Sequence, residues 1–238
     1  MPEVRVHPDI FRDFPDFRRG IVVASDMRNQ GGSADLEGLL SRVVEERRLR
    51  PVDLKGDPRV LAWNEAHRRF GSNPNKFPPA HAALLKRIQK PGSQVPFINK
   101  VVAIMNCNSI EAVMPVGGDD LDRAGLVLEL RRASGAETFI PLGTPEAMEH
   151  PLPAEVIYVV ADSGDVMCRR WNWRNGHTTC ITEDTRAMVM NIDALGVESE
   201  ARAIAGRDRV AEMLVEFCQA RVLTALLSPS QPVYRFEV

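Results

Sequence analysis

The chain has 238 residues, 44% of them hydrophobic and 26% charged, and its 30 basic and 32 acidic residues leave a net charge of −2. This balance is typical of one globular domain and excludes wholesale disorder, a low-complexity or collagen-like sequence, and a strongly basic nucleic-acid binder. No apolar run approaches the roughly 18 residues that span a bilayer, and the charged N-terminal stretch lacks the apolar core of a signal peptide, so we expect a cytoplasmic protein.

The first half of the chain is predicted to be mainly helical. A β-branched run at 20–24 indicates one early strand. Apolar residues at helical spacing predict four helices after it, and Asp57 followed by Pro58 is a typical helix start, with Gly71 as the stop. The helices are expected at 33–50, 57–70, 78–90 and 98–113.

After a turn-rich segment at 114–122, the sequence changes to short β-like runs bounded by Gly, Pro, Asp or Asn. A last helix is expected at 200–227, and the tail at 233–236 reads as one more strand. Because the helices come first and the strands later, we predict an α+β fold in which helices pack on a mainly antiparallel sheet. The strands are expected at 126–130, 138–140, 156–160, 166–173 and 187–192.

The cysteines do not indicate a metal centre, because they form no CxxC pair and no two histidines stand at a zinc-ligand interval. We therefore expect reduced, mostly buried thiols, no metal and no cofactor. A nucleophile pair of Cys180 and His177 would lack a third residue to orient it. The cysteines are Cys107, Cys168, Cys180 and Cys218.

Two polar segments could carry chemistry. Asn106, Asn108 and Ser109 interrupt an apolar helix and either face a pocket, face solvent or cap the helix end. Gly117 and Gly118 let a ligand approach the backbone closely, so that their N–H groups can bind an anion or a carbonyl group. The alternative is a tight turn before a helix-capping aspartate.

The segment 168–174 has the densest interleaving of basic and aromatic residues in the chain. If it is a strand, alternate side chains share a face. Its arginines could bind phosphate, and its tryptophans either pack in the core or stack on a base. The alternative is a core strand with a solvated cationic face. One face would carry Arg170, Asn172 and Arg174, and the other Arg169, Trp171 and Trp173.

Several segments match a known pattern in order and spacing: Trp63, 68–71, Asn106, 115–122, 169–174 and 182–185. This pattern resembles the B3/B4 domain of the bacterial phenylalanyl-tRNA synthetase β subunit and, more closely, the free-standing B3/B4-domain proteins. The resemblance covers roughly 63–195. It implies a single domain over 1–238, with 1–60 as a less well matched N-terminal extension.

In the synthetase this domain is an editing module that hydrolyses tyrosine wrongly attached to the phenylalanine tRNA. The resemblance therefore implies a tRNA-associated protein that binds the aminoacylated 3′ end, takes the amino-acid moiety as its ligand, and acts as a trans-acting aminoacyl-tRNA deacylase. One alternative is a non-catalytic module that binds tRNA or an amino acid, and another is a protein–protein adaptor. The sequence is compatible with a monomer or a homodimer.

The resemblance also assigns roles by position. The synthetase has histidine where this chain has Gly117 and glutamate where it has His177, so His177 either acts as a general base, holds a water, or marks a protein that binds without cleaving. The Gly117 and Gly118 amides are candidate oxyanion donors. The implied residues are His177 and Asn106 for catalysis, Pro115, Gly117, Gly118, Asn172 and Thr185 for the substrate pocket, and Arg169, Arg170 and Arg174 for tRNA binding.

Overall fold

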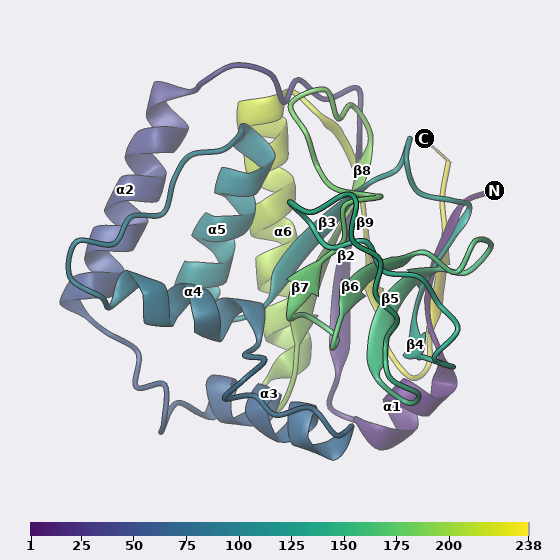
Figure 1. The fold of residues 1–238 in the computed structure, drawn as a ribbon. Helices are drawn as coiled ribbons and strands as arrows, with labels where there is room; N and C mark the ends of the chain where they lie inside the picture. Colours follow the sequence, from purple (N-terminus) through teal and green to yellow (C-terminus); the bar gives the residue numbers. More distant parts are fainter. Residues whose placement is uncertain (238) are drawn as a thin grey trace.

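Two β-sheets and six helices make up the fold in the computed structural model, which describes residues 1–237 (Figure 1). Only β1 and β4 are parallel neighbours, so the predicted α+β fold with mainly antiparallel strands is confirmed. The four-stranded sheet has the order β3 (Val116–Asp120), β8 (Met188–Ala194), β2 (Arg18–Ser25) and β9 (Arg221–Leu227). The six-stranded sheet has the order β10 (Val233–Arg235), β1 (Glu3–Val6), β4 (Val127–Arg132), β5 (Val156–Val160), β6 (Val166–Arg169) and β7 (Arg174–Asn175).

Most helices lie on one side of the four-stranded sheet, on the left in Figure 1, where α6 packs on β2 and α5 packs between α6 and α2. Gly20 on β2 allows the close approach, because a Cβ there would lie 2.8 Å from the Ala203 carbonyl oxygen. None of the described helices is long and apolar enough to cross a membrane. The helices are α1 (Pro8–Asp13), α2 (Ala34–Leu49), α3 (Pro58–Arg69), α4 (Ala80–Ile88), α5 (Lys100–Ala112) and α6 (Ser199–Cys218).

The other face of this sheet contributes to a second core that is rich in aromatic rings. Trp171 is at its centre and makes edge-to-face contacts with Phe14, Phe17 and Trp63, at centroid distances of 4.9, 4.9 and 5.0 Å. Both sheets add aliphatic side chains to this core. The N-terminal segment is therefore part of the fold, since it supplies two of these rings and the internal strand β2.

Apart from the segment 168–174, three predicted elements differ from the structure. The segment 114–122 contains β3, because it pairs along β8, and Gly118 fits there since a Cβ would lie only 3.2 Å from the Val189 carbonyl oxygen. The last helix ends at Cys218, where Gln219 turns left-handed with φ of 54°, and the segment after it pairs with β2 as β9. The run 138–140 forms only isolated bridges.

Candidate functional site

The tryptophan segment folds as a tight hairpin, so the strand predicted over 166–173 forms only over its first half, as β6, and the rest of that prediction is wrong. β6 ends at Arg169, which pairs with Arg174 on β7. Between them, Arg170 and Trp171 both have left-handed backbone conformations, with φ of 48° and 65°. Side chains do not alternate through such a turn, and the expected division of arginines and tryptophans between two faces is therefore wrong as well.

A buried carboxylate, Glu155, organises this hairpin. It accepts the Arg170 backbone N–H at 3.1 Å and pairs with the Arg169 guanidinium at 2.8 Å. Arg169 also pairs with Glu149 at 2.7 Å, so its guanidinium is held by two carboxylates. The other two arginines expected at the tRNA are held more loosely: Arg170 lies 3.9 Å from Glu155, and Arg174 lies 3.4 Å from Glu149.

A cavity of about 70 Å³ lies where β3, the hairpin and the start of α4 meet. It brings together four residues that the resemblance assigned to a substrate pocket: Pro115, Gly117, Gly118 and Asn172. The remaining walls come from β5, β6 and β8 and from the turn of the hairpin. Its lining also includes Ala80, Val116, Asp119, Tyr158, Cys168, Trp171, Asn175, Asn191 and Asp193.

A buried polar network lies at this cavity, and the sequence analysis missed it. The Tyr158 hydroxyl and the Trp171 indole N–H donate to one oxygen of Asp193, at 2.6 and 3.2 Å. Arg19 donates to the Asn191 side-chain oxygen at 3.0 Å and lies over the Tyr158 ring, 4.6 Å from its centroid. The sequence does contain a sign of this network, because polar residues occur in runs that otherwise have the composition of buried strands. These residues are Arg19 in β2 and Asn191 and Asp193 in β8.

Burial sets the ionisation of the two carboxyls that line the cavity. It raises the pKa of Asp193 to about 6, against the opposing effects of Arg19 and of the two hydrogen bonds. Burial likewise raises the pKa of Asp119 to about 6, although the Thr179 hydroxyl donates to it at 2.6 Å. At pH 7.5 both carboxyls are therefore mainly ionised, and either can accept a proton or bind an ammonium group.

Asn172 is oriented by a buried histidine. His67 Nε2 lies 3.2 Å from Asn172 Oδ1, and burial lowers the pKa of His67 to about 4, so the ring is neutral at physiological pH and donates to that oxygen. Among residues 1–237, neither the Asn172 amide nitrogen nor the second oxygen of Asp193 has a hydrogen-bond partner. The cavity lining thus offers a ligand one donor, on Asn172, and one acceptor, on Asp193.

The two side chains expected in catalysis are not among those that line this cavity. His177 lies in the loop that follows β7, and its ring is half-buried. Asn106 lies half-buried on α5. Its neighbour Ser109 faces inward and accepts the Val116 N–H at 3.2 Å, which fixes the start of β3.

Two threonines downstream of the hairpin hold β3 in place. Thr185, expected in the substrate pocket, is buried, and its hydroxyl donates to Asp120 at 2.6 Å, while Thr179 bonds Asp119 in the same way. Thr185 lines a different, larger cavity. The structure therefore gives Thr185 a bracing contact to β3.

Replacing Thr185 by valine, which has nearly the same shape, is expected to lower the free energy of unfolding by about 1–2 kcal/mol, because the buried Asp120 carboxylate loses a donor. Urea unfolding followed by circular dichroism measures this. The same change at half-buried Thr178 is expected to have an effect below about 0.5 kcal/mol. Equal effects at the two positions would contradict the bracing role.

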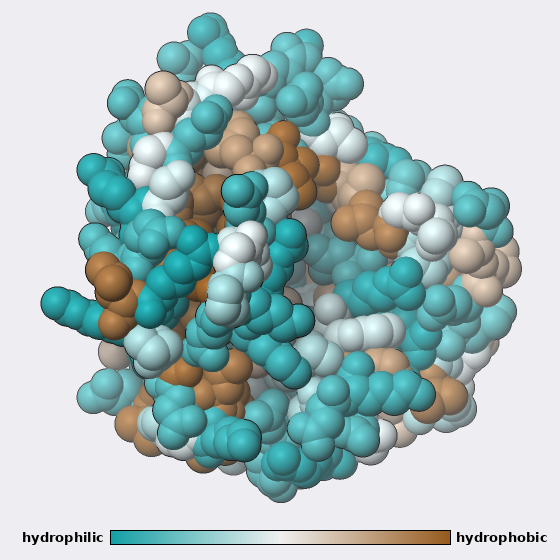
Figure 2. All heavy atoms as spheres, turned by 60° about the vertical axis from the view of Figure 1, so that its left-hand side comes forward, coloured by the Kyte–Doolittle hydropathy of each residue, from teal (hydrophilic) through white to brown (hydrophobic). Residues whose placement is uncertain are grey.

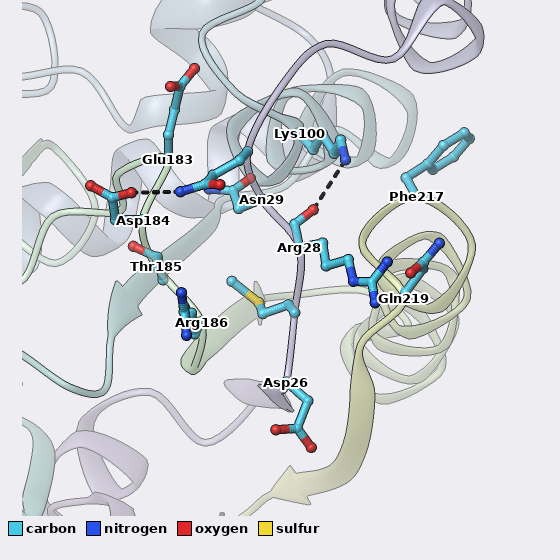
Figure 3. A pocket seen from close by; sticks show the side chains of 12 residues that line it. Asp26, Arg28, Asn29, Lys100, Glu183, Asp184, Thr185, Arg186, Phe217 and Gln219 are labelled. Carbon is cyan, nitrogen blue, oxygen red and sulfur yellow. Dashed lines mark hydrogen bonds between the residues drawn. The ribbon is translucent and has the colours of Figure 1, made fainter.

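A second cavity, of about 730 Å³, lies beside the N-terminus of α5 and the C-terminus of α6 (Figure 3). Its polar groups largely bind one another: the Lys100 ammonium donates to the Arg28 carbonyl oxygen at 3.1 Å and Gln30 donates to Asp184 at 2.7 Å. Its charges also balance, so the smaller cavity beside Gly118 is the better candidate site. The balancing side chains are Arg28, Lys100, Arg186, Asp26, Glu183 and Asp184.

The surface on the helical side of the molecule is hollowed near its middle (Figure 2). Hydrophilic side chains border much of this hollow, and apolar ones form several separate groups around it. Within residues 1–237, no three His, Cys, Asp or Glu side chains are grouped to hold a metal ion.

Comparison with known proteins gives one family match. The model of the B3/4 domain family matches residues 62–219. Among solved structures, an N-terminal fragment of the phenylalanyl-tRNA synthetase β-subunit from Pyrococcus horikoshii is similar to the chain, with a TM-score of 0.48 and 11% sequence identity. The similarity covers 94% of this chain and 53% of that one, so the chain spans about half the length of the fragment. No curated protein matches it.

Proposed function

The chain belongs to the B3/4 domain family, and we propose that it binds the aminoacylated 3′ end of tRNA and hydrolyses the aminoacyl ester. The motifs that resemble the synthetase editing domain support this proposal. One structural observation carries it: the open edge of β3 and two buried carboxyls meet at a single cavity.

The outer edge of β3 offers a donor for the oxyanion of the reaction. Val116 and Asp120 donate their N–H groups to acceptors outside the sheet, at 3.2 and 2.9 Å. Because hydrogen-bonding direction alternates along a strand, the N–H of Gly118, midway between them, points to the same side, whereas that of Gly117 points toward β8. Gly118 lines the cavity without a side chain, so a carbonyl oxygen can approach its N–H.

Hydrolysis also needs a water held against the ester carbonyl and a group that takes its proton. Asp119 and Asp193 line the cavity and are mainly ionised at pH 7.5. In our proposal one carboxylate binds the α-ammonium group and the other accepts a proton from the attacking water. The water oxygen bonds to the carbonyl carbon, the ester bond to the ribose breaks, and the carboxyl passes the proton to the leaving ribose oxygen. His177 stays a candidate base for a substrate that extends beyond the cavity.

The size of the cavity suggests the class of amino acid. Its volume of about 70 Å³ is below the roughly 150 Å³ that holds a benzene molecule inside a protein. We therefore expect esters of small amino acids such as glycine, alanine or serine to be hydrolysed faster than tyrosyl or phenylalanyl esters.

A second candidate function is a module that binds tRNA or an amino acid without cleaving the ester. The observation that favours it is the position of His177 and Asn106, which do not line the cavity. Binding would then depend on Asp193 and Asn172, each of which has one polar atom without a partner among the described residues.

The test is deacylation of a panel of aminoacyl-tRNAs by the purified full chain. We expect turnover of one or a few small aminoacyl esters, and a rate at least about 100-fold lower for Asp193→Asn, since a proton acceptor or ammonium partner is lost. The matched control, Asp184→Asn in the other cavity, should retain the rate. A His177→Ala, Asn106→Ala double variant tests the two groups assigned by resemblance.

The two candidate functions differ in the outcome of this panel. No turnover, with tRNA binding retained in a salt titration, would replace the hydrolase by the binding module. If every variant kept both the deacylation rate and the tRNA affinity of the unaltered chain, the cavity would be excluded as the site. Absence of both turnover and tRNA binding in the unaltered chain would reject both functions.

A further inference from the structure

The structure separates the two tryptophans of the hairpin. Trp171 is fully buried, whereas Trp173 is half-buried and packs edge-to-face on Phe77, with ring centroids 4.7 Å apart. Phe77 comes from the loop between α3 and α4 and is also half-buried. We refer to Phe77 and Trp173, with the cations Lys76, Arg170 and Arg174 around them, as the aromatic platform.

Three cations lie over the rings of the aromatic platform. The Arg170 guanidinium carbon is 3.8 Å from the Phe77 centroid and 5.6 Å from that of Trp173. Arg174 lies 5.9 Å from the Trp173 centroid, and the Lys76 ammonium lies 5.2 Å from that of Phe77. Cations within about 6 Å of a ring are attracted to its face, so rings and charges form one unit.

The aromatic platform keeps an excess of positive charge. Arg169 pairs with the nearby Glu155 and Glu149, at 2.8 and 2.7 Å, and its single charge offsets half of theirs. Arg170 and Arg174 approach the same carboxylates only at 3.9 and 3.4 Å. Lys76 is exposed. The charges that remain can therefore attract an anion to the rings.

The hairpin holds the rings in this arrangement against local strain. Two successive residues, Arg170 and Trp171, adopt the left-handed conformation that side chains disfavour. The Trp171 N–H bonds the Val156 carbonyl oxygen at 2.6 Å, which fixes the turn. Because of this turn, Trp171 enters the core and Trp173 stays at the surface, so the position of the platform is set before any ligand binds.

The aromatic platform borders the candidate cavity. Asn172, which lines the cavity, lies between the two tryptophans. Its carbonyl oxygen accepts the N–H of Ala80, another lining residue, at 2.8 Å. Phe77 stands three residues before Ala80, and so both rings of the platform are attached to the cavity wall.

We propose that the aromatic platform stacks the terminal base of a single-stranded RNA, while Arg174 and Lys76 bind the adjacent phosphate. Aromatic rings interleaved with arginine are typical of sites for single strands, since every base has a face that can stack. The proposal rests on the proposed function only for the origin of the RNA: an aminoacyl group in the cavity would place its own terminal nucleoside at this border.

The experiment is a fluorescence-anisotropy titration of a labelled short single-stranded RNA, without an acceptor stem or amino acid, with the full chain. We expect Trp173→Ala to weaken binding by at least about fivefold and Trp173→Phe to retain most of the affinity. Arg174→Gln should reduce the slope of log affinity against log salt by about 0.7. Binding of Trp173→Ala equal to that of the unaltered chain would overturn the proposal, as would no RNA binding at all.

Matched controls lie on the far strands of the sheets. Tyr234→Ala removes a half-buried ring that stacks on Phe236, and Arg221→Gln removes an exposed arginine; both should leave affinity and salt slope unchanged. An equal loss in these controls would also overturn the proposal. The aminoacyl-tRNA panel is an independent test. If the unaltered chain binds the short RNA and Trp173→Ala does not, while the unaltered chain neither deacylates nor binds tRNA, the proposed function is rejected and the aromatic platform is still supported.

Discussion

Replacing Arg19 by methionine is expected to lower the free energy of unfolding by about 3–5 kcal/mol at pH 7.5, the cost typical of removing one partner from a buried charge cluster. Arg19 has no exposed surface, bonds Asn191 and stabilises the ionised forms of Asp119 and Asp193. Methionine fills a similar volume, so the loss reports the uncompensated carboxylates more than a cavity.

This loss should shrink at acid pH. Each buried carboxyl has a folded pKa of about 6 and an unfolded pKa near 3.8, so the folded state binds more protons between these values. The penalty for burying the charge is fully present above pH 6 and disappears as the pH falls toward 4. Without Arg19 the folded pKa values rise further, and the difference between variant and unaltered chain should be smaller at pH 5 than at pH 7.5.

Guanidinium unfolding at the two pH values measures both effects. The control is Arg18→Met, the same change at the neighbouring residue, whose partner Glu200 is exposed at 60%. That change is expected to cost no more than about 1 kcal/mol at either pH, because it leaves the buried carboxyls unaffected. A loss for Arg19→Met that does not diminish at pH 5 would show that Arg19 acts through packing alone.

Replacing Trp171 by alanine is expected to lower the free energy of unfolding by about 3–5 kcal/mol, because it empties the centre of the aromatic core. The ring contacts Phe14, Phe17 and Trp63, and its indole N–H donates to Asp193. The same change at Trp173 should cost less than about 1 kcal/mol, since that ring is already half in water.

The two tryptophan variants can be compared by chemical unfolding and by near-ultraviolet circular dichroism. Trp171→Ala should lose most of the near-ultraviolet signal of the packed aromatic rings, and Trp173→Ala should keep it. The contrast separates folding from RNA binding, because Trp173→Ala is expected to weaken RNA binding while the aromatic core stays packed. Similar destabilisation by both changes would mean that the hairpin, and not the buried ring, holds the core.

The predicted site is partly assembled by the fold. Pro115, Gly117, Gly118 and Asn172, four of the residues that the resemblance assigned to a substrate pocket, line one cavity. Arg19 and Asp193, which are both charged side chains of the buried network there, were missed because each lies at one end of a mainly apolar run. Such a residue shows its role only when strands distant in sequence pair, as Arg19 and Asp193 do across β2 and β8.

Local sequence was sufficient for the helices of the first half and for the α+β class. The N-cap of α3 shows why: the Asp57 carboxylate accepts the Arg59 N–H at 2.9 Å, a contact between residues two apart that needs no tertiary partner. Helical spacing of apolar residues likewise depends only on the near sequence, and the predicted helices therefore agree with α2, α3, α4 and α5 to within a few residues.

Tertiary structure alone decided the hairpin, β3, β9 and the destination of each tryptophan. In the hairpin, alternation favoured a continuous strand, but the buried Glu155 and the Val156 carbonyl oxygen bind the backbone of Arg170 and Trp171 in a left-handed turn. These partners lie some fifteen residues away, and their hydrogen bonds in a dry interior outweigh the local cost of the turn. The motif thus resides in the sequence, while the separation of Trp171 into the core and Trp173 onto the surface arises from long-range contacts.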